Sequence, residues 1–136
     1  MTITEKQQSN TYSQDFLNNK FIEYKEIRKL LIENNWKTPN SYGGPEYSKF
    51  KKTEGVYIII LINTQDNYKT EISYIGRSFN LKSRHISHPV NRYIKLSIDP
   101  SFYTQIWFLE RNDSVEFEKY LIHKIKPKFN QHHKNG

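Results

Sequence analysis

The sequence predicts an α+β protein in which a small three-stranded antiparallel sheet is flanked by helices and preceded by an N-terminal helical extension. Two observations predict this class. Three segments rich in β-branched and aromatic residues, which are typical of strands, lie at 56–62, 71–76 and 102–109. Segments with helical spacing or helix-boundary residues lie before the first strand, between the second and third, and after the third. Strands and helices in this order are expected to pack as one sheet covered by helices.

The N-terminal extension comprises residues 1–53. Residues 1–14 are polar and expected to be loose, whereas residues 15–35 carry apolar side chains at roughly helical spacing and predict one helix. Residues 37–54 contain Pro39, Gly43, Gly44 and Pro45 and predict a loop. The helix has two readings: it covers the sheet, or its apolar positions, which include Phe16, Phe21 and Leu31, contact DNA or a second protomer.

The first strand is expected to be central, because residues 56–62 are apolar on both alternations. Residues 63–68 are polar and predict a turn, so that residues 71–76 form the hairpin partner of the first strand. Residues 102–109 form the third strand. Together the strands and the helices after them define a domain over residues 54–131, followed by a frayed tail at 132–136, with Gln131 already loose.

Helix boundaries are predicted from capping and proline signals. Asn80 is expected to cap a helix at 81–88 that Pro89 ends, and a second short helix is expected at 90–97. Asp113 with Glu116 resembles a capping box for a helix at 114–125. Pro127 then breaks that helix.

Composition narrows the class of function. The 136 residues carry a formal charge of +7 and no cysteine, which excludes disulfides and cysteine-based zinc sites. No apolar run reaches membrane-spanning length and the first residues do not resemble a signal peptide, so we expect a cytoplasmic or nucleoid-associated protein without a membrane partner. The stretch between Glu71 and Asp99 has no acidic residue but several basic ones: Arg77, Lys82, Arg84, Arg92 and Lys95. Such a stripe attracts a phosphate backbone, or is the solvated face of a lysine-rich protein.

Glu118 is the most informative single residue. On a helical wheel that starts at Phe117, Glu118 falls near 100°, in the middle of the apolar arc, whereas Glu116 falls near 260° and is expected to be solvated. A carboxylate aimed at a core is unfavourable unless it is paired or bound to metal. Glu118 is therefore either a metal ligand or the partner of an arginine such as Arg84.

The other candidate residues are ambiguous when taken singly. Arg84 and His88 are four residues apart and therefore share a helix face. Arg84 could bind a phosphate with its guanidinium and His88 could accept a proton. The same spacing also fits an exposed basic helix. Tyr57 and Tyr74 are strand tyrosines, which are usually packing residues. Asn130 follows a helix, where Asn is usually a turn residue.

Their order along the chain is more informative than any one of them. The segments are Gly55-Val56-Tyr57, Tyr74-Ile75-Gly76, Asn80-Leu81-Lys82-Ser83-Arg84, Glu118-Lys119-Tyr120-Leu121-Ile122 and Lys126-Pro127-Lys128-Phe129-Asn130. This order resembles the GIY-YIG nuclease family over about residues 54–131, and His88, four residues after Arg84, resembles its homing and restriction branch. Val56 replaces the family's usual isoleucine, and the segment between the two triads is longer than usual.

The resemblance implies the GIY-YIG fold and a metal-dependent DNA endonuclease that leaves 5′-phosphate and 3′-hydroxyl ends. It implies that Glu118 holds one Mg²⁺ or Mn²⁺ per site, that Tyr57 helped by His88 accepts the proton of the attacking water, and that Arg84 neutralises the phosphate. Tyr74 would position the water or the phosphate, and Asn130 would hold the site together. Residues expected to bind DNA around it are Arg77, Lys82, Arg92 and Lys95.

Two further readings remain open. The same fold can serve as a catalytically inactive nucleic-acid-binding protein, or its aromatic surface can bind a protein partner. For the nuclease, we expect either a homodimer that cuts both strands of duplex DNA or a protein that only nicks, because one domain holds one site and a duplex has two scissile strands.

Overall fold

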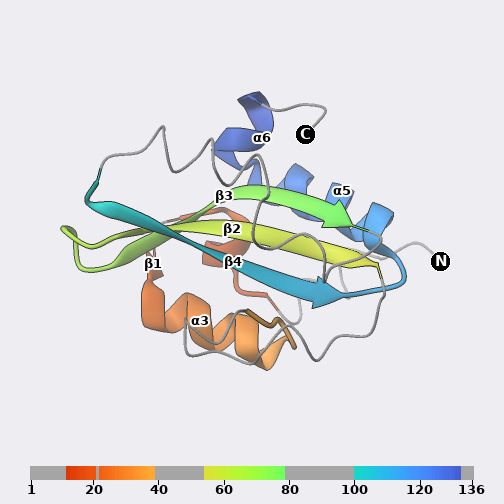
Figure 1. Ribbon diagram of the computed structural model, residues 1–136, viewed down its shortest axis with the longest axis horizontal. Coiled ribbons are helices and arrows are strands. Elements are labelled where there is room, and N and C mark those ends of the chain that lie inside the picture. The colour runs from red at the N-terminus through yellow and green to blue at the C-terminus, as the bar shows by residue number, and fades with distance from the viewer. Residues whose placement is uncertain (1–11, 21, 39–53, 79–99, 133–136) are drawn as a thin grey trace.

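The computed structural model describes residues 12–20, 22–38, 54–78 and 100–132, and the side chains of residues 131 and 132 are not described. These ranges contain four helices and four strands around one antiparallel sheet (Figure 1). In chain order they are α2 (Gln14–Leu17), β1 (Ile22–Glu23), α3 (Tyr24–Glu33), β2 (Gly55–Asn63), β3 (Lys69–Ser78), β4 (Phe102–Glu110), α5 (Ser114–Ile125) and α6 (Lys128–His132). The α+β class is confirmed. The sheet has the order β1-β3-β2-β4, and its two-residue strand β1 is one more than the three strands predicted.

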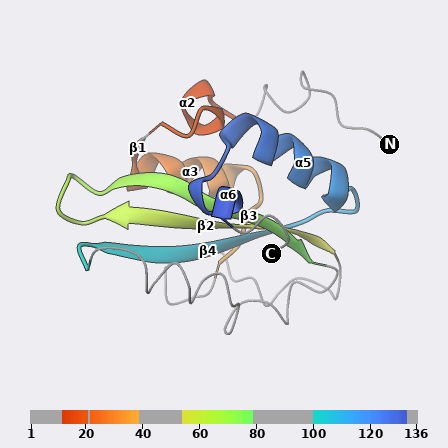
Figure 2. The same cartoon turned by 90° about the horizontal axis from the view of Figure 1, so that it is seen from above.

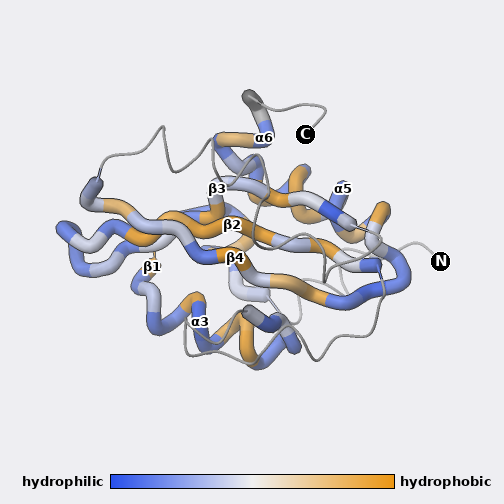
Figure 3. Tube along the Cα trace, viewed as in Figure 1, coloured by the Kyte–Doolittle hydropathy of each residue, from blue (hydrophilic) through white to orange (hydrophobic). Residues whose placement is uncertain are grey.

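Strand β2 is central, as the sequence predicts, and pairs with β3 on one side and with β4 on the other. Its side chains alternate between two buried clusters. Val56, Ile58, Ile60 and Ile62 face the side that we call the helical face, and Tyr57, Ile59 and Leu61 face the other side, the tyrosine face. Figure 3 shows the resulting apolar stretch along the middle of the sheet.

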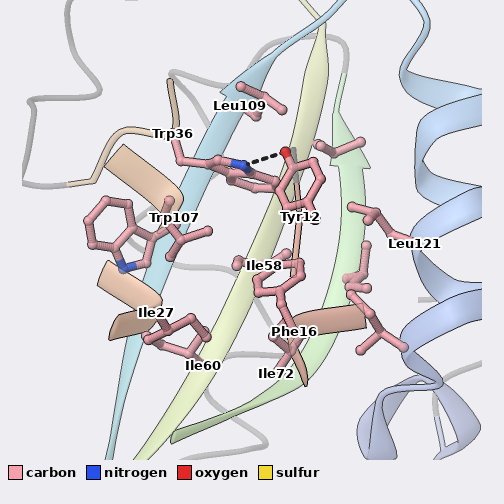
Figure 4. Close-up of a cluster of buried hydrophobic side chains, with 14 of the residues drawn as sticks. Tyr12, Phe16, Ile27, Trp36, Ile58, Ile60, Ile72, Trp107, Leu109 and Leu121 are labelled. Atoms are coloured by element: carbon pink, nitrogen blue, oxygen red, sulfur yellow. Dashed lines mark hydrogen bonds between the residues drawn. The ribbon is translucent and has the colours of Figure 1, made fainter. Parts of the chain in front are cut away.

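The helical face carries the larger part of the core. Helices α2, α3 and α5 all lie on this side of the sheet (Figure 2). Trp36 is fully buried and its indole donates a 3.0 Å hydrogen bond to the Tyr12 hydroxyl (Figure 4). Burial raises the pKa of Tyr12 to about 12, so this phenol remains protonated. Phe16 and Leu31 also belong to this cluster, which places the described part of the N-terminal extension in the same core as the sheet.

The prediction of a single helix at 15–35 is wrong. The segment forms α2, then a break, then β1 and α3. The break occurs at Asn19, whose φ of 53° lies in the left-handed region that Asn tolerates better than most residues. Its side chain bonds to Ile72 of β3 instead of facing solvent, and this long-range contact overrides the local helical pattern. Phe16 and Leu31, considered as partner-surface residues, are buried within the chain, and Phe21 lies outside the described residues.

Strand β3 carries an irregularity next to the second tyrosine. Ile59 pairs with Tyr74, but the next residue, Ile60, pairs with Ile72, so Ser73 is the extra residue of a β-bulge. The Ser73 hydroxyl donates a 2.8 Å hydrogen bond to the Ile59 carbonyl. The bulge places Ile72 and Ile75 on the same face although three positions separate them, and both side chains are buried there.

Two predictions about the helices after β4 need correction. The capping box does not form: Asp113 precedes α5 but makes no capping hydrogen bond, because its carboxylate is bound by Arg111 at 2.6 and 2.8 Å. The tail that was expected to be loose from Gln131 begins within a helix, because α6 extends to His132, and residues 133–136 lie outside the described residues. The helices predicted at 81–88 and 90–97 lie outside the described residues. No helix in the described part is long and apolar enough to cross a membrane.

Candidate active site

Tyr57 and Tyr74 meet on the tyrosine face of the sheet. They come from adjacent strands, and their ring centroids are 6.2 Å apart with an interplanar angle of 36°. Phe108 of β4 lies 6.2 Å from the Tyr57 ring on the other side, and Phe129 of α6 belongs to the same cluster. Both tyrosine side chains are buried. The two triads noted in the sequence are therefore one cross-strand aromatic pair.

Gly76 leaves space for the Tyr57 ring. The two residues are directly opposite in the β2–β3 register. A Cβ atom at Gly76 would overlap the end of the Tyr57 ring and its hydroxyl. The ring therefore lies across the backbone of β3, and its hydroxyl lies over Gly76. Any side chain at this position would displace the phenol.

Asn130 attaches α6 to the edge of β3 that faces away from β2, beyond the short pairing with β1. Its side-chain oxygen accepts a 2.8 Å hydrogen bond from the Ile75 amide, and its side-chain nitrogen donates a 2.9 Å hydrogen bond to the Ile75 carbonyl. Lys126 makes this contact possible, because its left-handed conformation, with φ of 53°, ends α5 and starts the turn to α6. The carboxamide thus takes the place of a neighbouring strand between the two triad residues Tyr74 and Gly76.

Glu118 approaches the same end of β3 from α5. Its carboxylate lies 3.8 Å from the Arg77 guanidinium, and the two side chains are 22% and 35% exposed. Arg77 follows Gly76, so it leaves the strand on the helical face, opposite to the tyrosines. Within α5 the buried positions are Phe117, Leu121 and Ile125, so Glu118 lies at the rim of the buried arc and not in its middle. Glu116 is exposed, as the wheel predicts.

Glu118 is partly buried beside two cationic side chains, Arg77 and Lys119. Burial raises the pKa of its carboxyl, and Arg77 and Lys119 only partly oppose this effect. The 3.8 Å separation in its ion pair with Arg77 is too long for a hydrogen bond. Mg²⁺ fits such a site because it often takes one or two protein carboxylates and completes its shell with water and phosphate oxygens.

The structure thus brings four predicted site residues to four consecutive residues of β3, from Tyr74 to Arg77. Tyr74 and the ring of Tyr57 lie on the tyrosine face, Asn130 lies at the edge, and Glu118 lies on the helical face. The ion-pair partner of Glu118 is Arg77, not the suggested Arg84. The remaining candidates lie outside the described residues: Lys82, Arg84, His88, Arg92 and Lys95. No group of three His, Asp or Glu side chains suited to a metal is found in the described part of the chain.

Two residues near this site were not identified from the sequence. Asn19 binds β3 at Ile72, and Ser73 forms the bulge. The only local signal for Asn19 was the pair Asn18-Asn19 inside an otherwise helical pattern, and such pairs favour turns. No pattern in the strand itself indicates that Ser73 is an extra residue.

Comparisons of this chain with protein-family models, with curated proteins and with solved structures give no match.

Proposed function

We propose that the end of β3 is the catalytic site of a metal-dependent endonuclease that hydrolyses DNA phosphodiester bonds to 5′-phosphate and 3′-hydroxyl ends. The observation that carries this proposal is that four predicted site residues lie around one end of β3: Tyr57 and Tyr74 on one face, Asn130 at the edge and Glu118 on the other face. These residues are distant in sequence, and they are the same residues whose order resembles the GIY-YIG motifs.

The proposed chemistry divides among these side chains. Glu118 would hold Mg²⁺ or Mn²⁺, and the bound ion would polarise the scissile phosphate and stabilise the leaving oxygen. Tyr57, with His88, accepts the proton of the attacking water, and Tyr74 orients that water or the phosphate. Arg84 neutralises charge that develops on the phosphate. Asn130 holds α6 against β3 through its two hydrogen bonds to Ile75, and this keeps the neighbouring Tyr74 in place.

The net charge of +7 supports a polyanionic substrate. Arg77, Lys82, Arg92 and Lys95 are the residues that we expect to contact the DNA backbone. Arg77 neighbours Glu118, so a phosphate bound between Arg77 and a cation on Glu118 would be contacted by positive charge on both sides.

Incubation with supercoiled plasmid tests the proposal. Wild-type protein should convert supercoiled DNA to nicked or linear forms with Mg²⁺ or Mn²⁺ and leave it intact in EDTA, and the new ends should accept ligation without treatment by a kinase. Binding of DNA without cleavage in any divalent cation would instead support the catalytically inactive nucleic-acid-binding protein. Absence of both activities would refute the proposal.

A further inference from the structure

We infer that Asn19, which lies in the N-terminal extension outside the motif region, is a positioning residue for Tyr74. The inference rests on the proposed function, because it concerns the rate of that reaction. It is carried by a different set of contacts, which connect the break after α2 to the bulge of β3.

Asn19 and Asn130 bind the edge of β3 in the same way. The Asn19 side-chain nitrogen donates a 2.9 Å hydrogen bond to the Ile72 carbonyl, and its oxygen accepts a 2.8 Å hydrogen bond from the Ile72 amide. Asn130 makes the equivalent pair with Ile75 at 2.9 and 2.8 Å. The two carboxamides therefore enclose two residues between them, Ser73 and Tyr74.

The spacing between these two contacts defines the position of the bulge. In a regular strand, the backbone groups that point to one edge recur at every second residue. The backbone groups of Ile72 and Ile75 both point to the edge away from β2 although the two residues are three positions apart, which requires one extra residue between them. Ser73 is that residue, and its hydroxyl donates a hydrogen bond to the Ile59 carbonyl of β2.

Tyr74 is the residue most sensitive to this arrangement. If the extra residue moved one position toward Ile75, Tyr74 would itself become the unpaired residue and would lose its place opposite Ile59. Asn130 binds the edge of β3 on the downstream side of the bulge. Asn19 binds it on the upstream side, where β1 also pairs with Thr70 and Lys69. Loss of the upstream contact would therefore loosen Tyr74 without removing any side chain from the aromatic pair.

Asn19 is itself held firmly. The helix before it is anchored in the core by Phe16 and Leu17. Its own amide donates to the Phe16 carbonyl at 3.0 Å, and the next amide, of Lys20, donates to Asp15 at 3.0 Å. Its left-handed φ of 53° is a conformation that Asn and Gly both accept. The contact with Ile72 is thus a rigid link between the core and β3.

The substitution Asn19→Gly tests the inference, because glycine keeps the backbone conformation and removes only the carboxamide. We expect the single-turnover cleavage rate at saturating protein to fall on the order of 10-fold to 10²-fold, as for a misplaced catalytic group. The Kd for DNA should stay unchanged. The matched control is Thr38→Val, which removes the 2.6 Å hydrogen bond to the Ile106 carbonyl at the other edge of the sheet and should leave the rate unchanged.

A double-mutant cycle with Tyr74→Phe separates positioning from general destabilisation. If Asn19 acts through Tyr74, Asn19→Gly should lower the rate in the wild-type background and have little further effect in Tyr74→Phe. Should Asn19→Gly melt below the assay temperature, Asn19→Asp keeps the acceptor for the Ile72 amide and is used in the same cycle.

The outcomes distinguish the two proposals. An active wild-type enzyme whose rate is unaffected by Asn19→Gly, or is reduced equally in both backgrounds, overturns the positioning role and leaves the nuclease intact. A wild-type protein that cuts no DNA overturns the proposed function, and the positioning role with it.

Discussion

The contact between the Tyr57 ring and Gly76 gives a physical reason for the glycine that ends the second triad. A methyl group at this position would overlap the phenol. We therefore predict that Gly76→Ala displaces the Tyr57 hydroxyl and lowers the cleavage rate by about 10², since an error near 1 Å in a catalytic group has effects of that size. Single-turnover rates and the Tm, measured together, check this prediction. A wild-type rate in a folded Gly76→Ala variant would contradict it.

We predict that the ionised Glu118 side chain lowers the free energy of unfolding when no metal is bound. Burial raises its pKa, so the folded state binds this proton more tightly than the unfolded state does. The resulting contribution to stability is present below the unfolded pKa of about 4.3 and is lost as the pH rises through the folded pKa. In EDTA at neutral pH, Glu118→Gln should therefore have a higher Tm than wild type. The difference should close in acid, and thermal melts from pH 3 to pH 8 measure it. A variant less stable than wild type at pH 7 would refute this prediction.

The position of Glu118 on its helix could be predicted from the sequence, whereas the contacts of Asn19 and Arg77 could not. The helical wheel separates Glu118 from Glu116, because position on a helix follows from the period alone, and the structure confirms that Glu116 is exposed and Glu118 half-buried. Asn19 was not predictable, because its importance depends on Ile72, which is 53 positions away in the chain. Arg77 as the partner of Glu118 likewise required the packing of α5 against β3.

At the scale of elements, the β2–β3 hairpin has an unfavourable turn. The Lys69 amide donates to the Asp66 carbonyl at 3.1 Å, and the two residues between them, Asn67 and Tyr68, have φ of 54° and 55°. This is the pattern of a type I′ turn, whose second central position favours glycine. Tyr68 is there instead, with 54% of its surface exposed.

We therefore predict that Tyr68→Gly stabilises the protein by about 1 kcal/mol, because it relieves left-handed strain and removes little buried surface. Urea unfolding measures the change, and Tyr103→Ser, at the other exposed aromatic residue, serves as a control without a turn effect. An unchanged or lower stability in Tyr68→Gly would show that the side chain compensates for the strain.

Elements were predictable from sequence where local pattern and packing agree. Residues 56–62 are apolar on both alternations, and β2 is indeed buried on both faces. The helix at 114–125 was also correct. The helix at 15–35 was wrong because a side chain–backbone contact at Asn19 interrupts it, and β1 was missed because two residues carry no periodicity. The capping box failed because Arg111 competes for Asp113.

At the scale of the whole molecule, the described residues contain one candidate catalytic carboxylate at β3. A duplex has two scissile strands of opposite polarity, so one protomer is expected to nick, and cleavage of both strands is expected to require two protomers related by two-fold symmetry. Plasmid cleavage over a range of protein concentrations, with light scattering on a duplex, tests this expectation. Linear product formed at first order by a strictly monomeric protein would contradict it.

The most direct test of the central claim compares two glutamates of α5. Glu118→Gln and Glu116→Gln make the same chemical change on one helix, but only Glu118 lies at the end of β3. The single-turnover rate of Mg²⁺-dependent cleavage should fall at least 10²-fold in Glu118→Gln and stay near wild type in Glu116→Gln, with DNA affinity retained by both. Equal rates for the two variants would contradict the assignment of the β3 end as the metal-dependent site.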